Sequence, residues 1–104
     1  MTAVELLAAL RSGTKSAESA LCEAIDAIEA DPGLCAFSVV DRERALSDAR
    51  RADADRVAGH AMGRLHGLPV AVKDNIALAG LPNTAGTPAL GGLTIDRDAD
   101  LVVR

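Results

Sequence analysis

Apolar residues recur at helical spacing near the start of the chain and predict two amphipathic helices. The first follows a capping box, in which Thr2 starts the helix and Glu5 reaches back to the Thr2 amide, and it ends near Gly13. The second starts at Ser16 and ends at the Asp-Pro-Gly sequence of residues 31–33. Its apolar face consists of five residues at helical spacing: Ala20, Leu21, Ala24, Ile25 and Ile28.

A different pattern follows in residues 34–40, LCAFSVV, which are apolar and rich in residues that favour strands. They predict a buried strand. Asp41 is the expected cap of a third helix, which runs to about Ala58 before Gly59 ends it. Its inner face is mostly alanine, so a neighbouring element has to supply packing volume: the expected inner residues are Ala45, Leu46, Ala49, Ala52 and Val57.

The rest of the chain alternates between glycine-rich loops and short extended pieces. Residues 59–69 predict a loop, and residues 70–72 predict the core of a strand that ends at a Lys-Asp-Asn sequence. Residues 76–81 predict a second extended piece, and residues 82–94, with their glycine, proline and threonine, predict an irregular loop. Asp98 is the expected cap of a last helix that starts at the next residue.

Composition narrows the functional classes. Hydrophobic residues make up 49% of the 104, but alanine accounts for 21 of them and Phe37 is the single aromatic, so the core is thin. The net charge is −4 and the basic residues are scattered, which argues against a nucleic-acid partner. No apolar run approaches the roughly 18 residues of a membrane span, and the first residues do not resemble a signal peptide. We therefore expect a cytoplasmic protein without a membrane partner.

Two cysteines, Cys22 and Cys35, are too few for a disulfide framework and lack the spacing of metal ligands. They are expected to be buried free thiols. The two histidines, His60 and His66, flank a glycine-rich loop and are too few for a metal site. We therefore expect neither a metal nor a cofactor.

Candidate chemistry gathers in residues 63–75, GRLHGLPVAVKDN. Lys73 follows three apolar residues at the C-terminal end of the predicted strand, which is the edge where sites gather in α/β folds. Burial there lowers the pKa of a lysine, and a neutral lysine can act as a general base. Asp74 points to the opposite face if the chain is extended, so it need not pair with Lys73. The alternative is an ordinary surface lysine at a strand end.

This block resembles the amidase signature enzymes, whose N-terminal part reads approximately G-x-L-x-G-[IVL]-P-[IVF]-x-[IV]-K-D-N, followed by a glycine and T-T-x-G-[ST]. Residues 80–87, GLPNTAGT, continue the match, although Asn83 stands where the family often has threonine. The final segment, DADLVVR, is similar to the start of the family's next helix. The resemblance covers essentially all 104 residues in order.

The resemblance implies an α/β fold with helices packed on a mixed sheet, of which this chain is the N-terminal portion, incomplete as given. Residues 1–104 are then a segment of a single amidase domain. Residues 1–58 form its helical N-terminal region with one strand, and residues 59–104 start the amidase core that contains the catalytic lysine. The implied activity is hydrolysis of a carboxylic acid amide to acid and ammonia through an acyl-serine intermediate.

In the family a lysine at the position of Lys73 is the terminal base of a Ser–cis-Ser–Lys triad. Both serines lie downstream of that lysine in the family, whereas all five serines here precede it: Ser12, Ser16, Ser19, Ser38 and Ser47. The chain therefore holds one of three catalytic residues and is expected to be inactive alone. Asp74 and Asn75 are expected to support the lysine loop through side-chain hydrogen bonds.

Several alternatives stay open at this point. The string TAGTPAL of residues 84–90 resembles the branch of mandelamide and indoleacetamide hydrolases. Other options are a non-catalytic interaction module, one half of a split amidase, or an amidotransferase A-type subunit. The expected partners are a small-molecule amide substrate and either a second copy of the chain or a complementing polypeptide.

Overall fold

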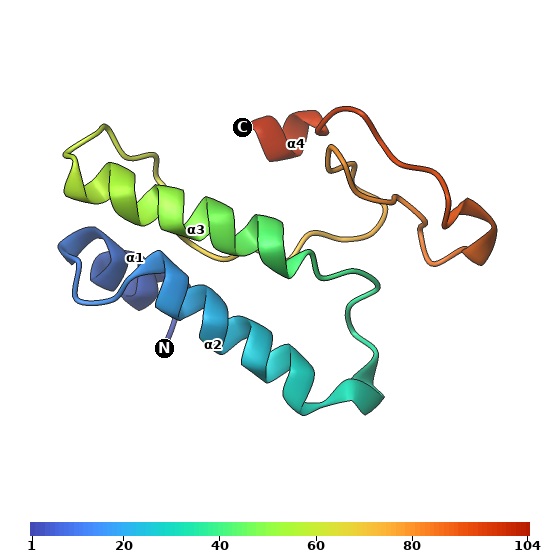
Figure 1. Ribbon diagram of the computed structural model, residues 1–104, viewed down its shortest axis with the longest axis horizontal. Helices are drawn as coiled ribbons and strands as arrows, with labels where there is room; N and C mark the ends of the chain where they lie inside the picture. The colour runs from blue at the N-terminus through green and yellow to red at the C-terminus, as the bar shows by residue number, and fades with distance from the viewer. The chain divides into compact units, whose positions relative to one another are not determined.

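The computed structural model describes all residues from Met1 to Arg104, and helices dominate its regular structure (Figure 1). The elements in chain order are α1 (Ala3–Ser12), α2 (Ala17–Ala30), the 3-10 turn η1 (Pro32–Leu34), α3 (Arg42–Val57), the 3-10 turn η2 (Pro88–Leu90) and α4 (Asp100–Val103). The chain divides into two compact units, Met1–Val70 and Ala71–Arg104. No helix is both long enough and apolar enough to cross a membrane.

Local side chains cap the first three helices, and these caps confirm the predicted helix starts. The Thr2 hydroxyl accepts the Glu5 N–H at 3.2 Å, and the Glu5 carboxylate accepts the Thr2 N–H at 2.6 Å, which completes the capping box of α1. Ser16 caps α2 by accepting the Ser19 N–H at 3.0 Å. Asp41 caps α3 in the same way. Each interaction joins residues three apart, so it can be read from sequence.

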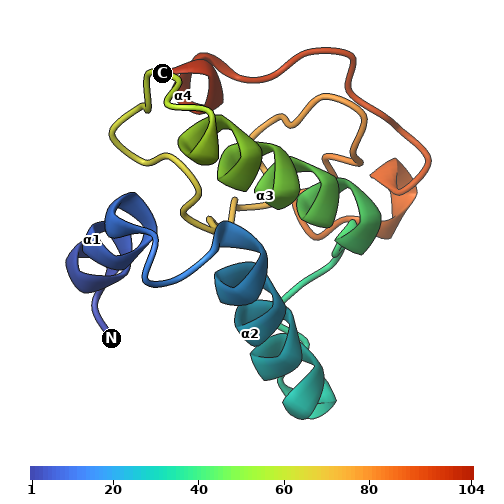
Figure 2. The ribbon, with the colours of Figure 1, turned by 60° about the vertical axis from the view of Figure 1, so that its left-hand side comes forward.

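The core of the first unit is built from small residues, with α2 packed against α3 (Figure 2). Its buried cluster contains Leu10 and three alanines, and partly buried leucines surround it: the cluster is Leu10, Ala17, Ala20 and Ala49, with Leu6, Leu21, Ala52 and Leu68 against it. The alanine side chains let the helices approach closely. The expectation that Val57 lies on the inner face is wrong, because 77% of it is exposed at the end of α3.

A second contact between the same two helices is polar. The carboxylate of Asp53, on α3, accepts the N–H groups of Ala17 and Glu18 at 2.8 and 3.1 Å. These amides belong to the first turn of α2 and have no partner inside that helix. A carboxylate at this position also interacts favourably with the positive end of the helix dipole. Asp53 therefore fixes the N-terminus of α2 against α3.

The loop that follows α3 returns across the helices of this unit. Gly67 has a φ of +77°, and a Cβ placed on it would lie 3.2 Å from the Cβ of Ala17. His66 Nε2 lies 2.8 Å from the carbonyl oxygen of Ala52, and the Arg11 side chain donates to the Arg64 carbonyl at 3.0 Å. The first part of the 63–75 block is thus packed onto the helices, and Gly67 allows both the close approach and the turn.

The prediction of a buried strand over residues 34–40 is wrong for this structure. Residues 32–34 form η1, and the apolar side chains of the segment are exposed: Leu34 by 69%, Phe37 by 42%, Val39 by 44% and Val40 by 43%. A strand needs a neighbour to accept its backbone hydrogen bonds, and no other strand is present in the chain. Cys35 is likewise exposed rather than buried, and Cys22 is half-buried.

Backbone hydrogen bonds join residues 80–82 to residues 94–95 in the second unit. Gly80 N–H donates to the Ile95 carbonyl at 2.8 Å, and Ile95 N–H donates to the Leu81 carbonyl at 3.3 Å. One antiparallel bridge joins Pro82 and Thr94. The prediction of an extended piece over residues 76–81 is wrong in its second half, because the Leu81 N–H donates to the Leu78 carbonyl at 3.1 Å and closes a turn at residues 79–80. The predicted strand over 70–72 is absent because nothing pairs with it. The mixed sheet implied by the family resemblance stays a prediction.

The prediction that Asp98 caps the last helix is wrong. Helix α4 begins at Asp100 after Ala99 and has no side-chain cap. The Asp98 carboxylate instead accepts the Ala79 N–H at 2.7 Å, and Ala99 N–H donates to the Ala77 carbonyl at 2.9 Å. The Asp98 carboxylate therefore accepts a hydrogen bond from Ala79, a half-buried residue of another segment, and not from the start of the helix.

Candidate functional site

Lys73 lies near the start of the second unit, where the chain turns. Its carbonyl accepts the Ile76 N–H at 2.9 Å, which closes a turn directly after the apolar residues 70–72. The Lys73 side chain is exposed, so the burial expected for a lysine at a strand end is not provided by these 104 residues. The reason is the same as for the missing strands, because no neighbouring element covers this position within the unit.

Asp74 connects the residues after Lys73 to a loop ten positions further along. One carboxylate oxygen accepts the Thr84 N–H at 3.0 Å, and the other accepts the Thr84 hydroxyl. The main-chain carbonyl of Asp74 also accepts the Ala85 N–H at 2.9 Å. We call these three hydrogen bonds the Asp74–Thr84 clamp. They tie the lysine loop to residues 84–87 through both side chain and main chain.

The loop at residues 84–87 uses its own amides to keep this shape. Gly86 N–H donates to the Thr84 hydroxyl oxygen at 3.2 Å, and Thr87 N–H donates to the Thr84 carbonyl at 2.8 Å. Ala85 and Gly86 have φ values of +49° and +77°. All four N–H groups of residues 84–87 therefore have acceptors within the chain, two on Asp74 and two on Thr84.

The supporting pair expected from sequence behaves unequally. Asp74 makes the contacts just described, whereas Asn75 is exposed and its side chain makes no hydrogen bond within the chain. Two residues with clear roles were not singled out from sequence, namely Thr84 and Asp53. Thr84 sits in a Thr-Ala-Gly-Thr string that signals a turn, but nothing local links it to Asp74. Asp53 interrupts the alanine-rich face of α3, which is the only hint of its role.

Other candidate side chains have structural partners. His60 Nδ1 lies 2.9 Å from an Asp55 carboxylate oxygen, and the Ser12 hydroxyl donates to the Ala9 carbonyl at 3.1 Å. No group of three or more histidine, cysteine, aspartate or glutamate side chains is arranged to hold a metal ion. The serines all lie in the first unit, while Lys73 lies in the second.

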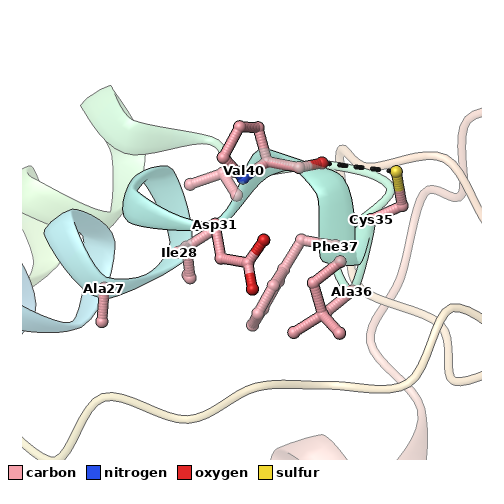
Figure 3. Close-up of a pocket in the computed structure, with 9 residues that line it drawn as sticks. Ala27, Ile28, Asp31, Cys35, Ala36, Phe37 and Val40 are labelled. Atoms are coloured by element: carbon pink, nitrogen blue, oxygen red, sulfur yellow. Dashed lines mark hydrogen bonds between the residues drawn. The ribbon is translucent and has the colours of Figure 1, made fainter.

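A pocket of about 300 Å³ lies in the first unit, between the end of α2 and the segment after it (Figure 3). Its wall is mostly apolar, with Ile28, Phe37 and Val40 on it and the Asp31 carboxylate as the charged group. Cys35 Sγ donates to the Pro32 carbonyl at 3.4 Å beside it. None of the residues Lys73, Asp74 or Asn75 is among the residues that line this pocket.

Comparison with known proteins decides the family. The family model described as Amidase matches residues 19–104. The chain belongs to the amidase family. Solved structures agree: two chains from work on a vestigial protein complex and the evolutionary origins of an s-triazine catabolic enzyme, one with inhibitor bound, align with a TM-score of 0.91. They share 35% sequence identity with this amidase chain, over 99% of it and 23% of their own length.

Several curated relatives of this chain share one description, the A-type subunit of glutamyl-tRNA(Gln) amidotransferase. The protein from Salinispora arenicola is 41% identical over 105 residues, which is 100% of this chain and 21% of its own length. Those from Acidothermus cellulolyticus and Rhodopirellula baltica are 41% and 38% identical. The chain thus spans about a fifth of these relatives. The lean toward mandelamide and indoleacetamide hydrolases, drawn from residues 84–90, is wrong, because these matches favour the amidotransferase alternative.

Proposed function

We propose that this chain is the N-terminal part of an amidase-family enzyme that works as the A-type subunit of an amidotransferase. The observation that carries the proposal is the block of residues 63–75, placed within a chain whose whole length aligns with such a protein at 41% identity. The proposed reaction is cleavage of a carboxylic acid amide with release of ammonia. The enzyme passes that ammonia on to an acceptor, as the word amidotransferase implies.

Lys73 is the proposed general base, and its amine accepts a proton through a bridging serine. The nucleophilic serine then attacks the amide carbon, the C–N bond breaks, and the proton goes to the departing ammonia. Water hydrolyses the acyl-serine to the acid. Both serines are proposed to come from sequence outside these 104 residues, and Asp74 is proposed to support the loop from which Lys73 projects. The mixed sheet and the burial of Lys73 are expected to come from the same outside sequence.

The proposal makes the 104 residues inactive alone, since Lys73 has no serine partner downstream of it in this chain. Completion by sequence in the same polypeptide and completion by a separate polypeptide, as in a split enzyme, are both compatible with this. The relatives are named as one component of an amidotransferase, which supports at least one further polypeptide as a partner. The name of these relatives also mentions a tRNA. The expectation that residues 1–104 have no nucleic-acid partner therefore stays a prediction.

A chimera tests the proposal. The matching fifth of the Salinispora arenicola protein is replaced by this chain, the other components of that amidotransferase are added, and ammonia release from an amide donor is measured. We expect the chimera to be active and Lys73→Ala to lower kcat by about 10²–10⁴-fold. The chain has one other lysine, Lys15, which pairs with Glu23 in the first unit, and Lys15→Ala is the matched control with unchanged activity.

Three results would contradict the proposal. An inactive chimera with normal folding argues for the non-catalytic interaction module. Full activity of Lys73→Ala removes the lysine from the mechanism. Lys73-dependent hydrolysis of a simple aryl amide by the 104-residue chain alone removes the requirement for outside serines.

A further inference from the structure

The Asp74–Thr84 clamp links the residue after Lys73 to a second loop through three hydrogen bonds. It joins two segments ten residues apart, and each of its three bonds involves either the Asp74 carboxylate or the Asp74 carbonyl. Both carboxylate oxygens are used on one residue, Thr84. Charge-assisted hydrogen bonds of this kind are stronger than neutral ones and fix geometry more tightly. The clamp is therefore a specific connection and not an incidental surface contact.

Thr84 is the central residue of this arrangement. Its N–H and its hydroxyl both donate to Asp74, and the same hydroxyl oxygen accepts the Gly86 N–H at 3.2 Å. Thr84 is half-buried, so a lost partner is not fully replaced by water. Valine has the same shape but no hydroxyl, while serine keeps the hydroxyl and loses only a methyl group. This difference makes Thr84 testable by a pair of conservative substitutions.

The clamp acts one peptide away from Lys73. The Lys73 carbonyl is fixed by the Ile76 N–H on one side, and the next residue is fixed by the clamp on the other. A lysine side chain is long and rotates freely, so the backbone position from which it projects is what the fold can set. Misplacing a catalytic group by about 1 Å can cost about 10²-fold in rate.

We propose that Thr84 is a positioning residue that sets the place of Lys73 through the carboxylate of Asp74. The inference rests on the proposed function, because it assumes that Lys73 takes part in catalysis. It assigns Thr84 no contact with substrate and no proton transfer. Its effect is on the geometry of the base, so it should appear in kcat and leave substrate binding unchanged.

The activity test uses the chimera described above. We expect Thr84→Val to lower kcat by about 10²-fold, with KM unchanged, and Thr84→Ser to recover most of the lost rate. Thr94 is an exposed threonine of the same unit outside the clamp, and Thr94→Val is the matched control. If Lys73→Ala is inactive while Thr84→Val keeps full kcat, the positioning role is overturned and the proposed function survives. An equal loss of kcat in Thr84→Val and in Thr84→Ser also overturns the positioning role.

A second measurement does not depend on activity. Amide hydrogen exchange of the full 104-residue chain reports the clamp at Thr84, Ala85 and Gly86, and it reports the Lys73 turn at Ile76. We expect all four amides to exchange faster in Thr84→Val than in the unaltered chain, and Thr84→Ser to restore their protection. If the chimera is inactive, the proposed function fails, and this exchange pattern still decides the clamp. Unchanged protection at Ile76 in Thr84→Val overturns the link to Lys73.

Discussion

The two units of this chain are stabilised by different means. In the unit Met1–Val70, three capped helices surround a core of leucine and alanine, and the Asp53 carboxylate adds a polar contact between two of them. In the unit Ala71–Arg104, the one α-helix has four residues, and the decisive contacts are hydrogen bonds accepted by backbone carbonyls and by the carboxylates of Asp74 and Asp98. Apolar side-chain packing is the main stabilising contact in the first unit, and hydrogen bonds to well-placed oxygen acceptors are the main contact in the second.

The block of residues 63–75 spans both kinds of structure. Gly67, near its start, has little room for a side chain beside Ala17 in the first unit, while Lys73 and Asp74, near its end, belong to the second. A single sequence motif therefore combines a packing requirement with a polar one. Substitutions at its two ends are expected to fail for different reasons, which the following experiments separate.

The largest effect is expected in the first unit. Leu10 is 4% exposed in the core cluster, so Leu10→Ala leaves a cavity and should cost about 2–4 kcal/mol in the free energy of unfolding. Val4, on the same helix and 77% exposed, is the control, and Val4→Ala should change stability little. Urea unfolding followed by helical circular dichroism measures both. Equal effects at the two positions contradict a core built around Leu10.

The next effect tests the packed end of the motif. Gly67→Ala combines a left-handed φ with a Cβ 3.2 Å from Ala17, so we expect a loss of about 1–3 kcal/mol. Gly63 lies four residues earlier in the same block, with open space around the position of a Cβ, and Gly63→Ala should be neutral. Thermal unfolding of the two variants gives the comparison. A neutral Gly67→Ala would show that the block does not pack as described.

A smaller effect is expected in the second unit. Asp98→Ala removes the acceptor of the half-buried Ala79 N–H and should cost about 1 kcal/mol. Asp98→Asn keeps an acceptor oxygen and should lose less, and the exposed Asp96 provides the control substitution Asp96→Ala. Exchange of the Ala79 and Gly80 amides is the measurement. If protection falls equally in Asp96→Ala, the effect comes from net charge and not from this hydrogen bond.

The smallest effect depends on pH. Hydrogen bonds from the Thr2 backbone and side chain lower the pKa of Glu5 below its ordinary value. The capping box therefore adds stability above the ordinary glutamate pKa of about 4.3, and this is lost as pH falls through the lower folded value. The protection of amides at the start of α1, measured relative to the intrinsic exchange rate at each pH, should fall over that range. Glu5→Gln, which does not titrate, should show no such step, and a step retained in it points to another group.

Sequence was a good guide where the determining contact is local. The caps Thr2, Ser16 and Asp41 act on residues three positions away, and all three are confirmed. It failed where the partner is distant or absent, as with the strand over 34–40, which finds no neighbouring strand. Asp98 shows the same limit, since the donor that it binds lies 19 positions away.

The same difference between local and distant contacts applies to the candidate site. Lys73 was found from a contiguous block of residues, and Asp74 was named with it. Thr84 was missed because its bond to Asp74 crosses ten positions that carry no periodic pattern. Sequence left the burial of Lys73 open between a desolvated base and a surface lysine, because burial depends on what covers a residue and not on its neighbours in sequence; within this chain it is exposed.

The first turn of α2 has a consequence for the order of folding events. The Ser19 N–H donates to Ser16, the residue that caps the same helix, whereas the Ala17 and Glu18 N–H groups donate to Asp53, more than thirty positions away. Local bonds can form within the time of helix formation, while distant ones must wait for loop closure. During refolding, protection of these three adjacent amides can thus report two separate events. Protection of the Ser19 amide reports the formation of α2, and protection of the Ala17 and Glu18 amides reports the docking of α3.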